Sequence, residues 1–162
     1  MTDFQQLYSR YADDIYRFAL YLCGDAADAE DITAETFVRV LTGKTPLISA
    51  TIKGYLLTIA RNLYLESLRR SKRRTDFPPE LVDTAALPEQ VAGDRAELDA
   101  LRSHLQRFPE DDRTALLLRS EGLSYEEIAD ALDISLASAK VKVHRLRLKL
   151  AEWRARRERT QI

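Results

Sequence analysis

The sequence predicts an all-α protein made of two small helical domains joined by a flexible linker. Apolar residues recur at steps of three and four along most of the chain, which is the period of one face of an α-helix. Gly and Pro, which interrupt helices, occur only five times each in 162 residues. Residues 75–90 lack this period and hold three of the five prolines. We therefore expect domains over residues 1–74 and 91–162.

Three helices are expected in the first domain. The first covers about residues 4–23 and is amphipathic. Asp25 is a suitable N-cap for a second helix, which stops at Gly43. Pro46 favours a loop after that glycine. The third helix extends from about Thr51 to Arg74, with a basic end expected to be exposed.

The second domain begins with a helix that carries Leu98, Leu101 and Leu105. A second helix follows Pro109, and its first turn holds three acids, which are favourable near the positive end of the helix dipole. The dipeptide Glu121-Gly122 ends this helix.

A helix-turn-helix is predicted after this break. Ser124 and Glu127 have the spacing of a capping box, which opens a short helix. Asp133 and Ser135 bound a tight turn before a second helix. This order is typical of DNA-binding domains in which the second helix enters the major groove. The alternative is a helical hairpin with a solvated charged face. The outward positions of the second helix are Ser138, Lys140, Lys142, His144 and Arg145.

Charge is distributed unevenly along the chain, although the total is −1. Residues 69–74 include five bases in six positions. Residues 140–159 hold nine Lys or Arg and two Glu, a net charge of +7. Between them, residues 76–112 hold ten acids and three Arg, a net charge of −7. Because local patches set the affinity for a polyanion, two nucleic-acid contacts are expected. The acidic stretch would screen them intramolecularly.

Other classes of protein are disfavoured. The single cysteine, Cys23, forms no internal disulfide and fits a reducing compartment. No signal peptide and no apolar run of about 20 residues is visible, so we expect a cytoplasmic protein without membrane insertion. The two histidines, His104 and His144, lack metal-site spacing from the acids. There is no Gly-rich phosphate loop or nucleophile elbow. No catalysis, metal or cofactor is expected.

Three segments resemble the extracytoplasmic-function sigma factors of the sigma-70 family. Residues 29–40 resemble their signature helix, and residues 54–70 resemble their promoter-facing helix. Residues 122–129 with 140–150 resemble their C-terminal helix-turn-helix. The likeness covers nearly the whole chain in the family's order, apart from the linker. The chain departs from the usual residues of the family at Ala34, Tyr55, Glu66, Asp133, Ser138 and Ala139.

The resemblance implies that residues 1–74 are sigma domain two. Its second helix would dock on the clamp coiled coil of the largest subunit of core RNA polymerase. Acids suit a basic partner, and an aromatic residue would anchor the contact. These residues are Asp28, Glu30, Asp31, Glu35 and Phe37. For each acid alone, ordinary placement near a helix start is the alternative.

The third helix of this domain would face the minus-ten promoter element. Residues 43–48 would help to form a pocket for a flipped base. Arg61 is expected to be exposed for DNA, whereas core packing is the alternative for Tyr55. The proposed contacts are Lys44, Lys53, Tyr55, Arg61, Asn62, Arg69, Arg70, Arg73 and Arg74.

Residues 91–162 would be sigma domain four and would read the minus-thirty-five element. Ser124 and Tyr125 join the outward residues of the second helix in this contact. The implied partners are promoter DNA, core polymerase, including the flap of its second-largest subunit, and an anti-sigma factor. The alternative function is a stand-alone regulator with a helical sensor domain, which has no need of a second DNA surface.

Overall fold

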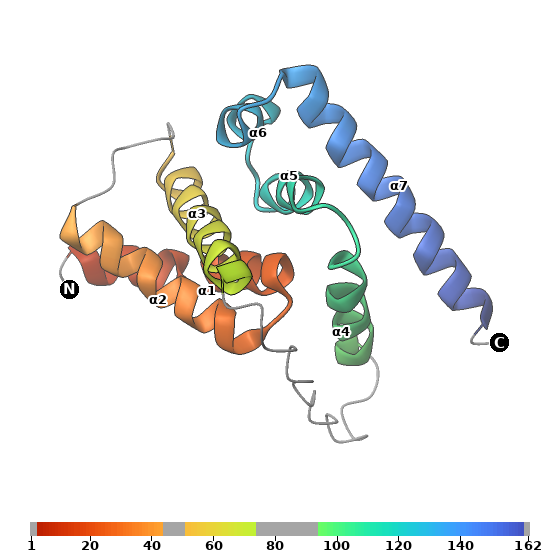
Figure 1. Ribbon diagram of the computed structural model, residues 1–162, viewed down its shortest axis with the longest axis horizontal. Helices are drawn as coiled ribbons and strands as arrows, with labels where there is room; N and C mark the ends of the chain where they lie inside the picture. Colours follow the sequence, from red (N-terminus) through yellow and green to blue (C-terminus); the bar gives the residue numbers. More distant parts are fainter. Residues whose placement is uncertain (1–2, 44–50, 74–93, 161–162) are drawn as a thin grey trace.

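The computed structural model describes residues 3–43, 51–73 and 94–160. The secondary structure within these ranges is seven α-helices, without a strand (Figure 1). The predicted all-α class is therefore confirmed. The predicted linker at residues 75–90 lies outside the described residues, as does most of the predicted loop at residues 43–48.

The first three helices form one bundle. They are α1 (Asp3–Cys23), α2 (Ala26–Thr42) and α3 (Ile52–Arg73). The observed helix ends agree with the sequence prediction, because residues near each end cap or terminate the helix through the neighbouring backbone. Asp25 accepts a hydrogen bond from the backbone amide three residues later, at 2.9 Å. Gly43 ends α2 in the left-handed conformation, with φ of 65°. The bundle core includes Ile15, Phe18, Leu22, Ile32, Leu56, Ile59 and Leu63.

Four helices follow in the second half of the chain. They are α4 (Asp94–Leu105), α5 (Glu110–Ser120), α6 (Tyr125–Leu132) and α7 (Leu136–Thr160). Helices α5, α6 and α7 pack on one another, and α7 extends well beyond α6 (Figure 1). Their core includes Leu116, Leu118, Leu123, Ile128, Ala139, Val143 and Leu146.

The predicted helix-turn-helix is present at α6 and α7. The Ser124 hydroxyl accepts from the amide of Glu127 at 3.1 Å, and the Glu127 carboxylate accepts from the Ser124 amide at 3.3 Å. Asp133 ends α6 with φ of 55°, in the left-handed region. The amide of Ser138 donates to the Ser135 hydroxyl at 3.1 Å, which caps α7. The turn between the two helices is therefore fixed by short-range hydrogen bonds.

The two halves of the chain pack against each other. Helix α1 contacts α4 and α5, and α3 contacts α5. The side chain of Gln106 passes Gly24 so closely that an added Cβ would lie 2.8 Å from its Cδ. Small domains bury a limited share of their surface, which favours such mutual support. In the part of the chain that the structure describes, no helix has the length and apolarity needed to cross a membrane.

Candidate nucleic-acid interface

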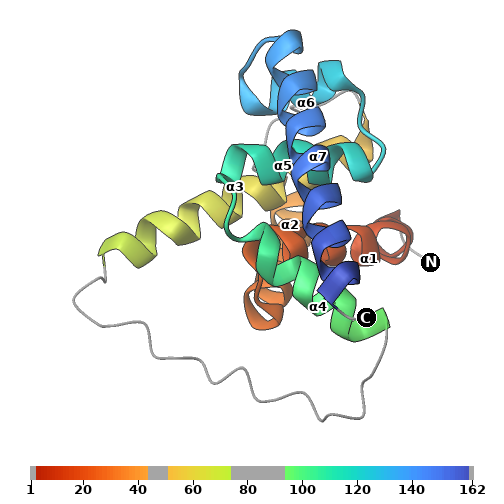
Figure 2. The ribbon, with the colours of Figure 1, turned by 90° about the vertical axis from the view of Figure 1, so that its right-hand side faces the viewer.

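The C-terminal end of α3 is the most prominent basic surface of the first half. Figure 2 shows this end of α3 projecting away from the other helices. Arg69, Arg70 and Lys72 are exposed there. The predicted contacts Lys44 and Arg74 lie outside the described residues, and so does the side chain of Arg73. The exposed cations can reach a polyanion without rearrangement of the bundle.

Arg61 does not share this exposure, so the prediction that it is exposed is wrong for this conformation. Its side chain is only 12% exposed, and its Nε and Nη2 donate to the two carboxylate oxygens of Glu110 of α5. Burial alone would raise the pKa of Glu110, but hydrogen bonds from Arg61 and Thr114 and the positive charge of Arg61 lower it to about 2. Glu110 is therefore ionised at neutral pH, and the pair is a salt bridge.

Other predicted minus-ten contacts are also partly covered. Lys53 is half-buried, with its ammonium 3.2 Å from Glu121 and 3.5 Å from Asp14. Tyr55 and Asn62 are half-buried, and Tyr55 packs against the core. Helix α3 thus has an exposed basic C-terminal end, whereas these residues of its N-terminal half are partly covered.

The recognition surface of α7 is largely open. Lys140, His144 and Arg145 are exposed on this helix, and Ser138 is half-buried at its first turn. Lys142 is different, because its ammonium lies 3.1 Å from Asp112 of α5. The prediction that Lys142 faces outward is therefore wrong for this conformation.

Two cations contact one aromatic ring at the start of the helix-turn-helix. The guanidinium carbon of Arg119 lies 4.6 Å from the Tyr125 ring centroid, and the Lys140 ammonium lies 6.0 Å from it. The Ser124 hydroxyl beside this ring is engaged in the helix cap. Sequence reasoning missed Arg119, because only the packing of α5 on α6 brings it to this ring. The ring holds two cations at one edge of the helix-turn-helix.

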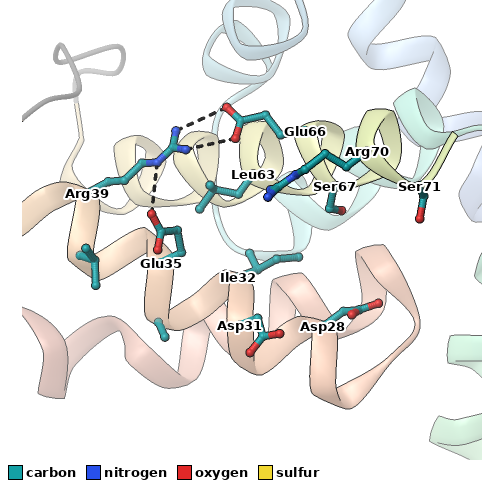
Figure 3. A pocket seen from close by; sticks show the side chains of 12 residues that line it. Asp28, Asp31, Ile32, Glu35, Arg39, Leu63, Glu66, Ser67, Arg70 and Ser71 are labelled. Atoms are coloured by element: carbon teal, nitrogen blue, oxygen red, sulfur yellow. Dashed lines mark hydrogen bonds and ion pairs between the residues drawn. The ribbon is translucent and has the colours of Figure 1, made fainter. Parts of the chain in front are cut away.

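An acidic groove lies between α2 and α3 (Figure 3). It has a volume of about 760 Å³. Arg39 connects its walls, because it pairs with Glu35 at 3.7 Å and with Glu66 at 3.1 Å. The charged lining residues are Asp28, Asp31, Glu35, Arg39, Glu66 and Arg70. Partial burial and the repulsion from Asp25 and Asp31 raise the pKa of Asp28. A basic partner would relieve this repulsion.

Phe37 is not part of the exposed α2 surface. It is 2% exposed and packs edge-on against Phe4 and Tyr8, with ring centroids 6.4 and 4.9 Å away. The prediction of an exposed aromatic anchor at Phe37 is therefore wrong for this conformation. Sequence reasoning missed Val38 and Leu41, which are 47% and 64% exposed. The three- and four-residue steps from the acids of α2 could have indicated both.

Comparisons with known proteins match both halves of the chain to regions of one protein family. Residues 7–74 match the family model for sigma-70 region 2, and residues 98–150 match the model for sigma-70 region 4. The ECF RNA polymerase sigma factor SigL of Mycobacterium tuberculosis is 33% identical over 161 residues, with 90% of this chain and 88% of SigL covered. The chain belongs to the extracytoplasmic-function sigma factors.

Two further similarities support the same family. The ECF RNA polymerase sigma factor SigE of Mycolicibacterium smegmatis is 36% identical over 162 residues, covering 96% of this chain and 63% of SigE. The chain thus spans less than two thirds of that relative. The sigma factor RpoE of Bartonella quintana, solved in complex with the anti-sigma factor NepR, has a TM-score of 0.76 and 25% identity. This match covers 94% of the present sigma factor and 96% of RpoE.

Proposed function

We propose that this sigma factor binds core RNA polymerase, recognises a two-part promoter and supports DNA melting at initiation. The observation that carries the proposal is the order of two sigma regions along one chain, each with its own basic surface. Residues 1–74 would act as domain two, residues 91–162 as domain four, and residues 75–90 as the linker. A stand-alone regulator is not favoured, because its sensor half would not match sigma-70 region 2.

Helix α2 supplies the proposed contact with the clamp of the largest polymerase subunit. Asp31 and Glu35 offer charge to a basic partner, while Val38 and Leu41 supply the apolar area first assigned to Phe37. Asp28 and Glu30 extend the acidic face toward the start of the helix. Apolar anchors surrounded by charge are typical of such interfaces.

The DNA contacts are divided between the two domains. The α3 positions predicted from the sequence would engage the minus-ten element, and the exposed cations of α7 would engage the minus-thirty-five element. Arg145 and His144 lie on the outward face of α7, and Ser138 lies at its first turn, where side chains reach base edges. Lys142 would join them only after it leaves Asp112.

Further partners follow from the relatives. Sigma factors in this family act with core polymerase, and the solved RpoE structure contains an anti-sigma factor. We extend both kinds of partner, including the polymerase flap, to this chain. Acting on polymerase in the cytoplasm, it would need no active site of its own.

The test is transcription with purified core polymerase on a pool of genomic fragments, with and without the sigma factor. Transcripts that begin downstream of one shared two-part motif only when the protein is present would support the proposal. Absence of core binding and of new transcripts, with DNA binding retained, would instead support a stand-alone regulator.

Substitution of the α2 surface tests the docking contact separately. We expect V38Q/L41Q to weaken core binding at least about tenfold, which corresponds to about 1.4 kcal/mol. The matched control is L148Q, because Leu148 of α7 is 53% exposed and lies in the other domain. Equal affinities of the two variants for core polymerase would refute the assignment of α2.

A further inference from the structure

The outward face of α7 is apolar at its centre near the helix-turn-helix, although cations surround it. Val141 is 48% exposed and is the sixth residue of this helix. Single exposed apolar side chains are common on protein surfaces and usually have no special role. Val141 differs because it lies on the helix that a helix-turn-helix presents to DNA, in the part where side chains meet base edges.

The direction of Val141 follows from the period of the helix. An α-helix turns by about 100° per residue, because it has 3.6 residues per turn. Val141 is two residues from Ala139 and two from Val143, which are both fully buried. It therefore lies about 160° around the helix axis from each of them, at the centre of the face opposite the core. Ala137, one turn earlier, is exposed on the same side.

Cations lie on both sides of this apolar centre. Lys140 and Arg147 are exposed on one side, about 100–120° around the axis from Val141. Arg145 and Lys149 are exposed on the other side, about 40–80° around the axis. In a major groove, the phosphates line both edges and the base edges form the floor. The arrangement therefore directs cations toward phosphates and Val141 toward bases.

Val141 is also close enough to the start of α7 to reach this floor. It lies about 8 Å along the axis from Leu136, at 1.5 Å per residue. The major groove is about 12 Å wide and 8.5 Å deep, so the first two turns of the helix fit within it. Leu148 is 53% exposed on the same face, but it lies about 18 Å from the start of α7, which is farther than the groove is wide.

An aliphatic side chain has one specific ligand on the floor of the major groove. Among the four bases, only thymine carries a methyl group there, on C5. Contact between this methyl group and the isopropyl group of Val141 removes apolar surface of both from water. Against other base edges, the isopropyl group would displace water from donors and acceptors without replacing the hydrogen bonds. Both effects favour thymine.

We propose that Val141 is a specificity-determining residue, which reads the C5 methyl group of a thymine in the upstream promoter element. The inference rests on the proposed function, because that function brings α7 to the minus-thirty-five element. The polar and charged side chains of α7 bind phosphates and the hydrogen-bonding groups of bases. Val141 selects a thymine at one base pair of the element, on either strand.

The test begins with selection of binding sites from random-sequence duplexes. The full chain is used both alone and assembled with core polymerase. Each thymine of the selected site is then replaced, one at a time, by deoxyuridine, which lacks only the C5 methyl group. We expect one replacement to weaken binding by the parent protein roughly fourfold, which corresponds to the loss of one buried methyl group.

The test variant is V141S, which replaces the isopropyl group by a small side chain that water solvates. The matched control is L148S, which makes the same kind of change at an exposed position of the same face, beyond the groove. V141S should bind the thymine and deoxyuridine duplexes equally well, whereas L148S should retain the difference shown by the parent. Circular dichroism establishes that both variants are folded.

A parent protein that tolerates deoxyuridine at every thymine would overturn the inference, as would a difference that V141S leaves unchanged. If V141S weakens binding to core polymerase and leaves the DNA difference unchanged, the apolar face binds protein and the inference is wrong. Transcription with core polymerase separates these results from the proposed function. Promoter-dependent transcripts without a methyl-sensitive thymine in the upstream element refute only the role of Val141. Methyl-dependent binding by the full chain alone, without transcription, refutes only the sigma activity.

Discussion

Replacing Tyr64 by phenylalanine removes one hydroxyl from the boundary between the domains. This hydroxyl, on α3, accepts a hydrogen bond from Arg113 of α5 at 2.9 Å. Both residues are buried, and the ring keeps its packing. A hydrogen bond to a charged group contributes about 1.5–3 kcal/mol. Because Arg113 retains the carbonyls of Leu22 and Phe108, we expect a loss of about 2 kcal/mol in the free energy of unfolding.

Thermal unfolding followed by circular dichroism measures this loss. In a chain of this size, 1 kcal/mol corresponds to about 2–4 °C, so Y64F should lower Tm by about 4–8 °C. The matched control is Y16F. Tyr16 is half-buried on α1, and its hydroxyl makes no hydrogen bond within the described residues. Its substitution should change stability by less than about 0.5 kcal/mol.

A Tm change as small as that of the control would refute this reasoning. It would mean that Tyr64 and Arg113, which belong to different domains, do not meet in solution. A double-mutant cycle with R113M gives a second measure of the same contact. A coupling energy near zero would lead to the same conclusion.

Three further predictions concern the domain boundary, the start of the helix-turn-helix and the contact between α4 and α7. G24A should destabilise the protein more than G122A in urea unfolding. Both glycines have positive φ, and alanine in that conformation loses about 1–2 kcal/mol of stability. Only at Gly24 would the added Cβ also collide with Gln106. Equal losses would contradict the contact. S124A should lower the free energy of unfolding by about 1 kcal/mol, and with it Tm, because the Glu127 amide loses its hydrogen bond to the Ser124 hydroxyl. An unchanged Tm would contradict the capping box. Burial and repulsion from Arg107 and Arg156 lower the pKa of His104, which stacks on Trp153 at 4.5 Å. The contribution of neutral His104 is therefore present above about pH 6.5 and is lost as pH falls through its lowered pKa. The fluorescence of Trp153, the single tryptophan, should report that transition, and H104Q should abolish it.

The helix boundaries could be predicted because they depend on residues only a few positions apart. Asp25, Gly43 and Ser124 cap or end helices through hydrogen bonds to the backbone nearby. Asp133 lies at the predicted turn before α7 and adopts the left-handed conformation there. Phe37 lies in the core under α2. Only the resemblance had suggested an exposed role for it.

Family membership could also be inferred from the sequence, because three motifs occur in the order of the family. The exposure of charged side chains could not. A helical period identifies the apolar face, but it does not show which cations another domain covers. Lys142 turns toward Asp112, and Arg61 turns toward Glu110, through contacts that depend on how α5 packs.

The helices, the helix-turn-helix and the sigma family could be inferred from the sequence, since each depends on local hydrogen bonding or on motif order. The covering of Arg61 and Lys53 in the N-terminal half of α3 depends on tertiary packing. Arg61 meets Glu110 across 49 residues of chain, and Arg17 meets Glu121 across 104. Ion pairs at such separations form only after two domains have packed, because the burial of α5 against α1 and α3 brings the charges together.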